Sequence, residues 1–178
     1  MAYAQQGPAK GRGNAKTAVT TVYLVRHAEK DTTPGLADPP LSPVGEVRAL
    51  ALRKQLAKHR PTALFTTDTK RTRSTLAPLA AATRLEPLVY NPKENAALVQ
   101  RIQQEYKGKT VVVVGHSNTL LPLIEAMGGT SSVKEIGDNE YDYLFTVRLV
   151  EGAQPTVTVR HYGAKQKAAP VAKAVPMR

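Results

Sequence analysis

The sequence predicts an α/β fold: a three-layer α/β/α sandwich whose sheet is mostly parallel with an antiparallel edge. Strand-like and helix-like patterns alternate through the middle of the chain, as they do in βαβ units. Residues 111–114 are four consecutive valines, a run that is apolar on both faces, as a parallel sheet covered on both sides requires. Near the end, two alternating segments flank Glu151-Gly152 and predict a hairpin at one sheet edge.

The expected elements follow one another with short connections. We expect strands at residues 20–26, 63–66, 88–90, 111–114, 141–150 and 156–162. Three of the expected helices span residues 69–82, 93–106 and 118–127. Residues 27–40 form a loop, because prolines and a glycine interrupt every periodic pattern there.

The remaining helix opens at Ser42. Ser42 is a good N-cap, Pro43 suits the first helical position, and Glu46 lies near the positive end of the helix. The helix stops at His59-Arg60-Pro61, and its expected apolar face consists of Leu50, Leu52 and Leu56.

Composition narrows the class of protein. The 178 residues suit one domain, and 42% hydrophobic content is ordinary for a globular chain. Cysteine is absent, so the chain has no disulfides and no thiol chemistry. No apolar run is long enough to span a membrane.

The net charge of +11 comes largely from the two ends of the chain. These ends hold basic residues and no acid: Lys10, Arg12, Lys16, Lys165, Lys167, Lys173 and Arg178. The middle is only mildly basic, which fits a site for a small anion better than a broad face for nucleic acid. We therefore expect a disordered segment at residues 1–18, one domain at 19–163 and a disordered basic tail at 164–178.

The cellular location stays open between two interpretations. Ala2-Tyr3-Ala4 resembles the end of a secretory signal peptide, which indicates an exported or periplasmic protein. The other interpretation is a chance alanine-rich leader on a cytoplasmic protein.

Two histidines follow two apolar strands. Arg26-His27 ends the first strand, and His116 directly follows residues 110–115. In an open α/β sheet, ligands bind in the crevice at the carboxyl ends of the strands. The pair, with an Arg next to one of them, indicates chemistry on an anion.

Four short stretches carry a resemblance. They are Arg26-His27-Ala28-Glu29, Leu41-Ser42-Pro43-Val44-Gly45, Arg71-Thr72-Arg73-Ser74-Thr75 and Gly115-His116. In this order they resemble the motifs of the histidine phosphatase superfamily, which has the phosphoglycerate-mutase-like fold, and the compact chain is similar to its short bacterial phosphatases. Ala28 stands where the family has Gly. The resemblance covers about residues 22–162.

The resemblance implies a role for each matched residue. His27 would be the nucleophile that forms a phosphohistidine, a role that suits imidazole near neutral pH. Arg26 and Arg71 would hold phosphoryl oxygens, and His116 would stabilise the developing charge. Ser117, Asn118 and Glu29 are further candidates for substrate or phosphate binding, with Glu29 alternatively orienting its neighbours. No metal or other cofactor is expected, because cationic side chains neutralise the phosphate.

Other residues compete with these or lie apart from them. Arg73 is two positions from Arg71 and so points elsewhere on the helix, towards the rim or an acid. His59 and His161 stand outside every motif. The helix after His116 is expected to direct free N–H groups towards the phosphate.

The general acid is the least defined part of the site. In one branch of the family a Glu follows the third strand, and Glu94 lies nearest that place; an ordinary acid in the first turn of a helix is the alternative. A second branch has Asp directly after the second histidine, where this chain has Ser117. Without an acid, substrates with good leaving groups are favoured: aryl phosphates, acyl phosphates and phosphoramidates.

The leading interpretation is a metal-independent phosphatase acting on a phosphomonoester or phosphoramidate. Alternatives are phosphoglycerate-mutase-type phosphotransfer and a non-catalytic module that binds phosphorylated ligands. The expected partner is a small phosphorylated substrate or a phosphoprotein, with no specific nucleic acid and no membrane span, and the sequence leaves the oligomeric state open.

Overall fold

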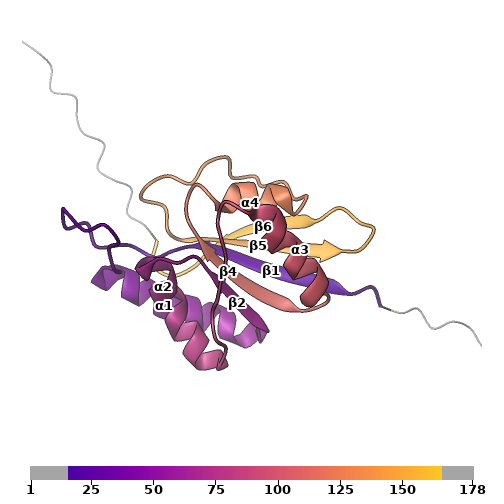
Figure 1. Ribbon diagram of the computed structural model, residues 1–178, viewed down its shortest axis with the longest axis horizontal. Coiled ribbons are helices and arrows are strands. Elements are labelled where there is room, and N and C mark those ends of the chain that lie inside the picture. Colours follow the sequence, from indigo (N-terminus) through magenta and orange to yellow (C-terminus); the bar gives the residue numbers. More distant parts are fainter. Residues whose placement is uncertain (1–15, 166–178) are drawn as a thin grey trace, which may run out of the picture.

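The computed structural model describes residues 16–165, which form a six-stranded mixed sheet flanked by helices (Figure 1). The strand order is β3-β2-β4-β1-β5-β6. The strands are β1 (Val19–Arg26), β2 (Ala63–Thr66), β3 (Leu88–Val89), β4 (Thr110–Gly115), β5 (Tyr143–Val150) and β6 (Thr156–His161). The helices are α1 (Pro43–Leu56), the 3₁₀ turn η1 (Ala57–His59), α2 (Lys70–Thr83), α3 (Asn95–Glu105) and α4 (Leu120–Ala126).

The expected fold class is confirmed, including the antiparallel edge. Strand β1 pairs in parallel with β4 and antiparallel with β5, and β5 and β6 form the expected hairpin. Strands β2 and β3 extend the parallel part. The first strand of the chain therefore lies inside the sheet, between two strands that come much later in the sequence.

Two hydrophobic layers lie on opposite faces of the sheet. One joins α1 and α2 to the sheet through Leu52, Leu76, Leu79, Val112 and Val114. The other joins α3 and α4 to it through residues such as Ile102, Leu123, Val111, Val113 and Phe145. Alternate valines of β4 thus face opposite layers, which explains why the strand is apolar throughout.

Helix α1 begins as expected but buries a different face. Ser42 is the N-cap and its hydroxyl accepts the Gly45 N–H at 3.2 Å. Leu52 and Leu56 are buried, whereas Leu50 is 53% exposed, so its expected core position is wrong. Arg48 is buried at 4% exposure instead, because Glu29 and the end of the domain lie against that face of the helix.

Helix α1 also packs tightly against the segment after β1. The backbone N–H of Ser42 donates to the Glu29 carbonyl at 2.9 Å. A Cβ built on Gly45 would lie 2.1 Å from the same carbonyl oxygen, so this helix position admits only glycine. This close approach fixes the segment that carries the first histidine.

Helix α4 is shorter than expected, since it begins at Leu120 rather than at residue 118. The N–H groups of Thr119 and Leu120 donate to the His116 carbonyl at 3.1 and 3.2 Å. These two amides are therefore engaged, and the expectation that they point freely towards an anion is wrong.

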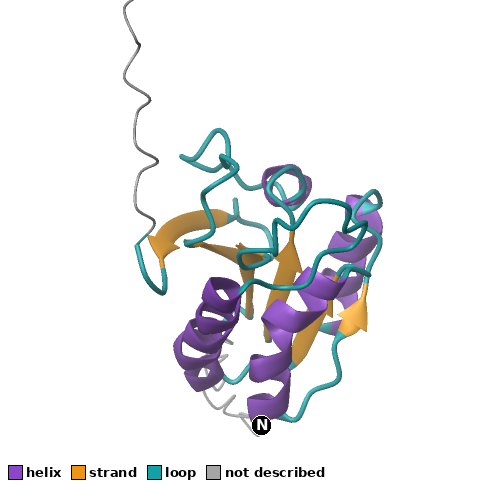
Figure 2. Ribbon diagram, turned by 90° about the vertical axis from the view of Figure 1, so that its left-hand side faces the viewer, coloured by secondary structure: helices purple, strands orange, loops and turns teal. Residues whose placement is uncertain are grey.

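The loops after the parallel strands gather at one end of the molecule. Figure 2 looks onto this end, where loops cover the ends of the strands. Of the disordered segments expected at residues 1–18 and 164–178, residues 1–15 and 166–178 lie outside the described residues. Among the helices of residues 16–165, none combines the length and apolarity needed to cross a membrane.

Candidate active site

The two histidines meet where β1 and β4 end. Arg26 pairs with Gly115 in the sheet register, and the His27 N–H donates to the Gly115 carbonyl at 2.9 Å. The ring centroids of His27 and His116 lie 5.5 Å apart in an edge-on arrangement. Neighbouring parallel strands thus place the two imidazoles side by side, as their positions in the sequence predict.

The His27 ring is held in one tautomer. Its Nδ1 lies 2.7 Å from the Ala28 carbonyl, which can only accept, so Nδ1 carries the proton and donates it. The other nitrogen, Nε2, then keeps its lone pair. Burial lowers the pKa of His27 from 6.5 to about 3, and the charges of Arg26 and Arg71 act in the same direction. The residue is a neutral imidazole with an available nucleophilic nitrogen.

Thr75 fixes the backbone that orients this ring. Its hydroxyl accepts the Ala28 N–H at 2.8 Å and donates to the Arg71 carbonyl at 2.7 Å. A single buried hydroxyl thereby joins the loop after β1 to α2. The same α2 turn supplies Arg71, so His27 and Arg71, the expected nucleophile and the expected phosphate ligand, share one support.

A chain of threonines holds His116. Its Nε2 lies 2.9 Å from the Thr67 hydroxyl, which donates to Thr72 at 3.0 Å, and Thr72 donates back to the Thr67 carbonyl at 2.9 Å. Burial and the charges of Arg71 and Arg26 lower the pKa of His116 to about 4. A bound phosphate dianion would reverse the local charge and favour its protonated form.

Arg26 is held by the loop before β5. Its Nη1 donates to the carbonyls of Gly137, Asp138 and Glu140 at 2.9 to 3.0 Å, and its guanidinium lies 4.0 Å from the centre of the Tyr141 ring. The residue is 6% exposed, yet its Nε is buried without a hydrogen-bond partner among the described residues. The Nη1 of this guanidinium is therefore fully hydrogen-bonded, whereas its Nε is not.

Arg71 shows the same feature. Its Nε is buried without a partner, and its Nη1 lies 3.5 Å from an Asp38 carboxylate oxygen. Leaving a buried donor unpaired costs about 1–3 kcal/mol, so native proteins rarely do so. Two unpaired guanidinium donors beside two neutral histidines form a site that an oxyanion would complete.

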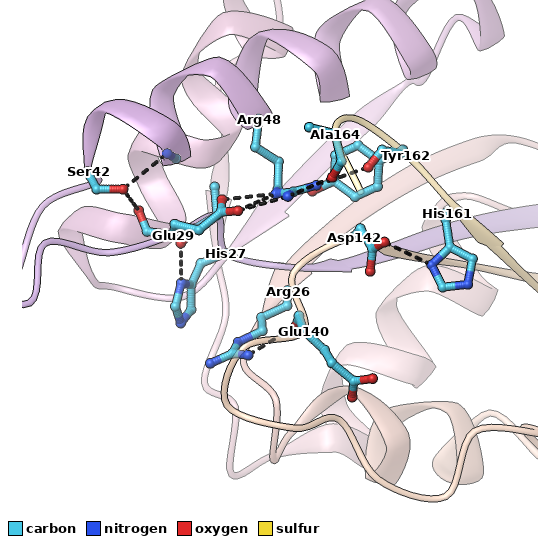
Figure 3. A network of polar contacts seen from close by, with 12 residues as sticks. Arg26, His27, Glu29, Ser42, Arg48, Glu140, Asp142, His161, Tyr162 and Ala164 are labelled. Carbon is cyan, nitrogen blue, oxygen red and sulfur yellow. Dashed lines mark hydrogen bonds and ion pairs between the residues drawn. The ribbon is translucent and has the colours of Figure 1, made fainter. Parts of the chain in front are cut away.

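The Glu29 carboxylate points away from the His27 ring and towards Arg48 (Figure 3). Both of its carboxylate oxygens accept from the Arg48 guanidinium at 2.8 to 2.9 Å. Arg48 also donates to the carbonyls of Tyr162 and Ala164 at 3.0 and 3.1 Å. Of the two roles expected for Glu29, this geometry favours orienting its neighbours.

Glu94 is not brought into contact with the histidines. It is exposed at the N-cap position of α3, and among the described residues its carboxylate makes no hydrogen bond or ion pair. It lines a separate cavity of about 210 Å³ with Tyr90, Asn91 and Arg101. The structure therefore favours the ordinary helix-terminus acid for this residue.

The remaining candidates divide between the site and the surface. Ser117 and Asn118 line a cavity of about 440 Å³ next to His116, although neither side chain makes a hydrogen bond within the described residues. Arg73 pairs with Asp68 at 2.8 Å, as expected for an arginine outside the phosphate site. His59 contacts the Tyr23 ring and His161 pairs with Asp142, so both lie apart from the motif residues.

Two residues of the site escape sequence reasoning. Tyr141 stacks on Arg26, with its ring centre 5.9 Å from that of His27, and Asp38 reaches Arg71 from the loop after β1. The sequence includes Thr75 in a motif but does not indicate its role in holding the loop after β1. For Tyr141 and Asp38 the only signal is their place in the glycine- and proline-rich loops before β5 and after β1.

No three His, Cys, Asp or Glu side chains among residues 16–165 are grouped in a way that could hold a metal ion.

The part of the chain that matches a known family contains the first residues of the site. The model of the histidine phosphatase superfamily (branch 1) matches residues 22–93, which contain Arg26, His27 and Arg71. No curated protein matches the sequence significantly.

Several solved structures share the fold. A putative phosphohistidine phosphatase SixA from Nakamurella multipartitia is 22% identical, with a TM-score of 0.58, over 82% of this chain and 98% of that chain. The protein histidine phosphatase SixA complexed with tungstate is 16% identical, with a TM-score of 0.61, over 79% and 96% of the two chains. A mycobacterial glucosyl-3-phosphoglycerate phosphatase is also 16% identical, with a TM-score of 0.61, over 83% and 100%.

The matched residues 22–93 contain the Arg-His segment and Arg71, and the shared fold includes the sheet that carries His116. Over residues 22–93 the chain is similar to the histidine phosphatase superfamily, and it has the fold of these solved phosphatases.

Proposed function

We propose that the protein is a metal-independent phosphatase that hydrolyses a phosphomonoester or a phosphoramidate through a phosphohistidine at His27. The observation that carries the proposal is the pair of buried, unpartnered guanidinium donors, Nε of Arg26 and Nε of Arg71, beside a neutral His27. Guanidinium groups suit phosphate oxygens, and neutral imidazole suits attack at phosphorus.

The reaction has two steps. In the first, Nε2 of His27 attacks phosphorus, the bond from phosphorus to the leaving atom breaks, and that atom keeps the electron pair and takes a proton from solvent water. In the second, a water oxygen attacks the phosphohistidine, the P–N bond breaks, its electron pair returns to Nε2, and the attacking water gives its proton to solvent. Arg26, Arg71 and protonated His116 stabilise the phosphoryl oxygens in both steps.

Proton donation to the leaving group separates substrate classes. Glu94 makes no contact with the histidines, and Glu29 is bound to Arg48. Asp38 contacts Arg71 through its carboxylate, and Asp138 contacts Arg26 through its backbone carbonyl. Because neither carboxylate hydrogen-bonds to a histidine within residues 16–165, we favour substrates that need little proton donation. The similar structures named as phosphohistidine phosphatases support a phosphoramidate among these.

The first test is His27→Ala. This change is expected to lower kcat/KM for p-nitrophenyl phosphate by about 10³-fold or more, because it removes the nucleophile. His59→Ala is the matched control, since His59 is exposed and its ring lies against Tyr23, apart from the motif residues. Full activity in the His27 variant would contradict the proposal.

Two further measurements separate the alternatives. Substrate labelled in the phosphoryl group should leave label on His27, whereas a binding module would retain none. Chelation of divalent metals should leave the rate unchanged if the phosphatase is metal-independent. Transfer of the phosphoryl group between positions of phosphoglycerate, without net hydrolysis, would identify a mutase instead.

A further inference from the structure

Three threonine side chains form a chain of hydrogen bonds that ends on the ring of His116. The Thr67 hydroxyl lies 2.9 Å from Nε2 of His116 and donates to the Thr72 hydroxyl at 3.0 Å. The Thr69 hydroxyl lies 2.8 Å from the same Thr72 hydroxyl. Thr67 and Thr72 are almost completely buried, so little water competes for these bonds, and the protein itself sets the direction of each one.

Two backbone carbonyls decide where the proton of the Thr72 hydroxyl goes. This hydroxyl lies 2.9 Å from the Thr67 carbonyl and 3.1 Å from the Thr69 carbonyl, and a carbonyl can only accept. Because a hydroxyl has a single proton, Thr72 gives it to a carbonyl and accepts the hydrogen bond from the Thr67 hydroxyl. Thr67 has then used its own proton and can only accept from the histidine. Nε2 of His116 therefore carries a proton and donates it to Thr67.

The other nitrogen of His116, Nδ1, is the one that can still gain a proton. It makes no hydrogen bond within residues 16–165, and in a neutral ring protonated at Nε2 it keeps its lone pair. The charged and titratable groups that act on the ring are Arg26 and His27, from the end of β1, and Arg71, from α2. Burial and the two arginine charges lower the pKa of His116 and keep the ring neutral. A bound phosphate dianion would offset both charges, and the added proton would then go to Nδ1.

We propose that Thr67 and Thr72 are positioning residues for the reaction, and that they make Nδ1 the nitrogen of His116 that contacts the phosphoryl group. The inference rests on the proposed phosphatase function and deepens it, because the two histidines then use opposite ring nitrogens. Nε2 of His27 attacks phosphorus, whereas the Nδ1–H of protonated His116 donates a hydrogen bond to a phosphoryl oxygen. Neither threonine touches the substrate, and both act through the ring of His116.

Nitrogen NMR of the full-length protein with isotope-labelled histidine measures the tautomer directly. Protonated and unprotonated ring nitrogens give separate signals, and the chain has four histidines, so the loss of one set in His116→Gln identifies the signals of His116. Near neutral pH we expect a proton on Nε2 and none on Nδ1 in the protein alone. With saturating inorganic phosphate we expect protons on both nitrogens. A proton on Nδ1 with Nε2 unprotonated, or an Nδ1 that stays unprotonated with phosphate bound, overturns the inference.

Thr67→Val removes the hydroxyl and keeps the shape of the side chain. Without a fixed partner at Nε2, a neutral imidazole divides its proton between its two nitrogens. We therefore expect a mixture of tautomers at His116 and a fall of about tenfold in kcat/KM for p-nitrophenyl phosphate, roughly what one buried hydrogen bond contributes. Thr67→Ser keeps the hydroxyl and should restore the tautomer and most of the lost rate. Thr83→Val is the matched control, because Thr83 donates to the Leu79 carbonyl at the far end of α2 and should change neither measurement.

The outcomes separate this inference from the proposed function. An unchanged tautomer and rate in Thr67→Val, or equal losses in Thr67→Val and Thr67→Ser, overturn the inference even if hydrolysis depends on His27. If Thr67→Val does not fold, the tautomer of the unmodified protein still decides, because a proton on Nδ1 alone contradicts the order of the hydrogen bonds. A proton on Nε2 of His116 without any His27-dependent hydrolysis would instead retain that order and overturn the phosphatase function.

Discussion

At the scale of single residues, the two neighbouring histidines differ in what their second nitrogen does. His27 gives its Nδ1 proton to a backbone carbonyl, which leaves Nε2 to react. The Nε2 of His116 lies against the Thr67 hydroxyl, which gives its own proton to Thr72, so this Nε2 carries a proton and donates it. His27 is thus suited to attack, and His116 to a change of protonation when the charge at the site changes.

The lowered pKa of His27 makes stability depend on pH. Unfolded His27 takes up a proton near pH 6.5, whereas the folded residue stays neutral down to about 3. The unfolded state binds more protons between these values, so the contribution is complete above pH 6.5 and is lost as pH falls towards 3. Between pH 7 and 5, a fully buried histidine with this shift accounts for a loss of about 2 kcal/mol.

Replacing His27 with Gln should remove this part of the acid destabilisation. We expect the variant to lose about 2 kcal/mol less free energy of unfolding than the unmodified protein between pH 7 and 5. Urea unfolding at the two pH values measures the difference, and His59→Gln serves as the control. Parallel losses in the His27 variant and the unmodified protein would show that His27 titrates normally in the fold.

At the scale of elements, α1 supports the segment that carries His27. Arg48 reaches from α1 to Glu29 in the loop after β1 and to the carbonyls that follow β6 (Figure 3). The side chains are 3% and 13% exposed, so the pair is largely shielded from water. It ties a helix, the first motif and the end of the domain into one unit.

Arg48→Met should destabilise the protein by about 3 kcal/mol, because it removes one side of an ion pair that is largely shielded from water. Chemical denaturation measures this value. Arg53→Met is the control on the same helix; Arg53 is exposed, so the change is expected to stay within about 0.5 kcal/mol. If Arg48→Met were as mild as its control, the ion pair would contribute little to the fold.

Local sequence patterns predict most of the helices and strands, but not always which face of a helix is buried. The valine run fixes β4, and the Ser42-Pro43 start fixes the beginning of α1, because both depend on neighbours in sequence. The burial of Arg48 in place of Leu50 depends on Glu29 and Tyr162, which lie far away along the chain. Hydrophobic periodicity predicts that leucines are buried, and it does not indicate a buried arginine whose partner lies far away in the sequence.

At the scale of the whole molecule, the site draws on segments spread over most of the chain. Motifs predict His27, Arg71 and His116, since each directly follows or adjoins a recognisable strand or helix. Tyr141 and the carbonyls around it come from an irregular loop, and only the folded chain brings them to Arg26. Loop conformation depends on such long-range contacts, and a single sequence does not reveal them.

Anion binding should therefore stabilise the entire domain. Inorganic phosphate at about 100 times its dissociation constant should add about 2.7 kcal/mol and raise Tm by roughly 5–10 °C. Arg71→Ala should abolish most of this shift, whereas Arg73→Ala, which removes an exposed arginine paired with Asp68, should retain it. A differential scanning fluorimetry titration decides the matter: equal shifts in both variants would place the anion elsewhere.

The position of β1 has a consequence for how the enzyme is made. The ribosome delivers β1 first, but the two strands that flank it, β4 and β5, come from the second half of the chain. A nascent polypeptide holding both His27 and Arg71 still lacks His116 and the loop that grips Arg26. On the proposed mechanism, phosphoryl transfer therefore requires synthesis to have passed the loop before β5, and a product truncated before that loop is expected to be inactive even though it contains the first motifs.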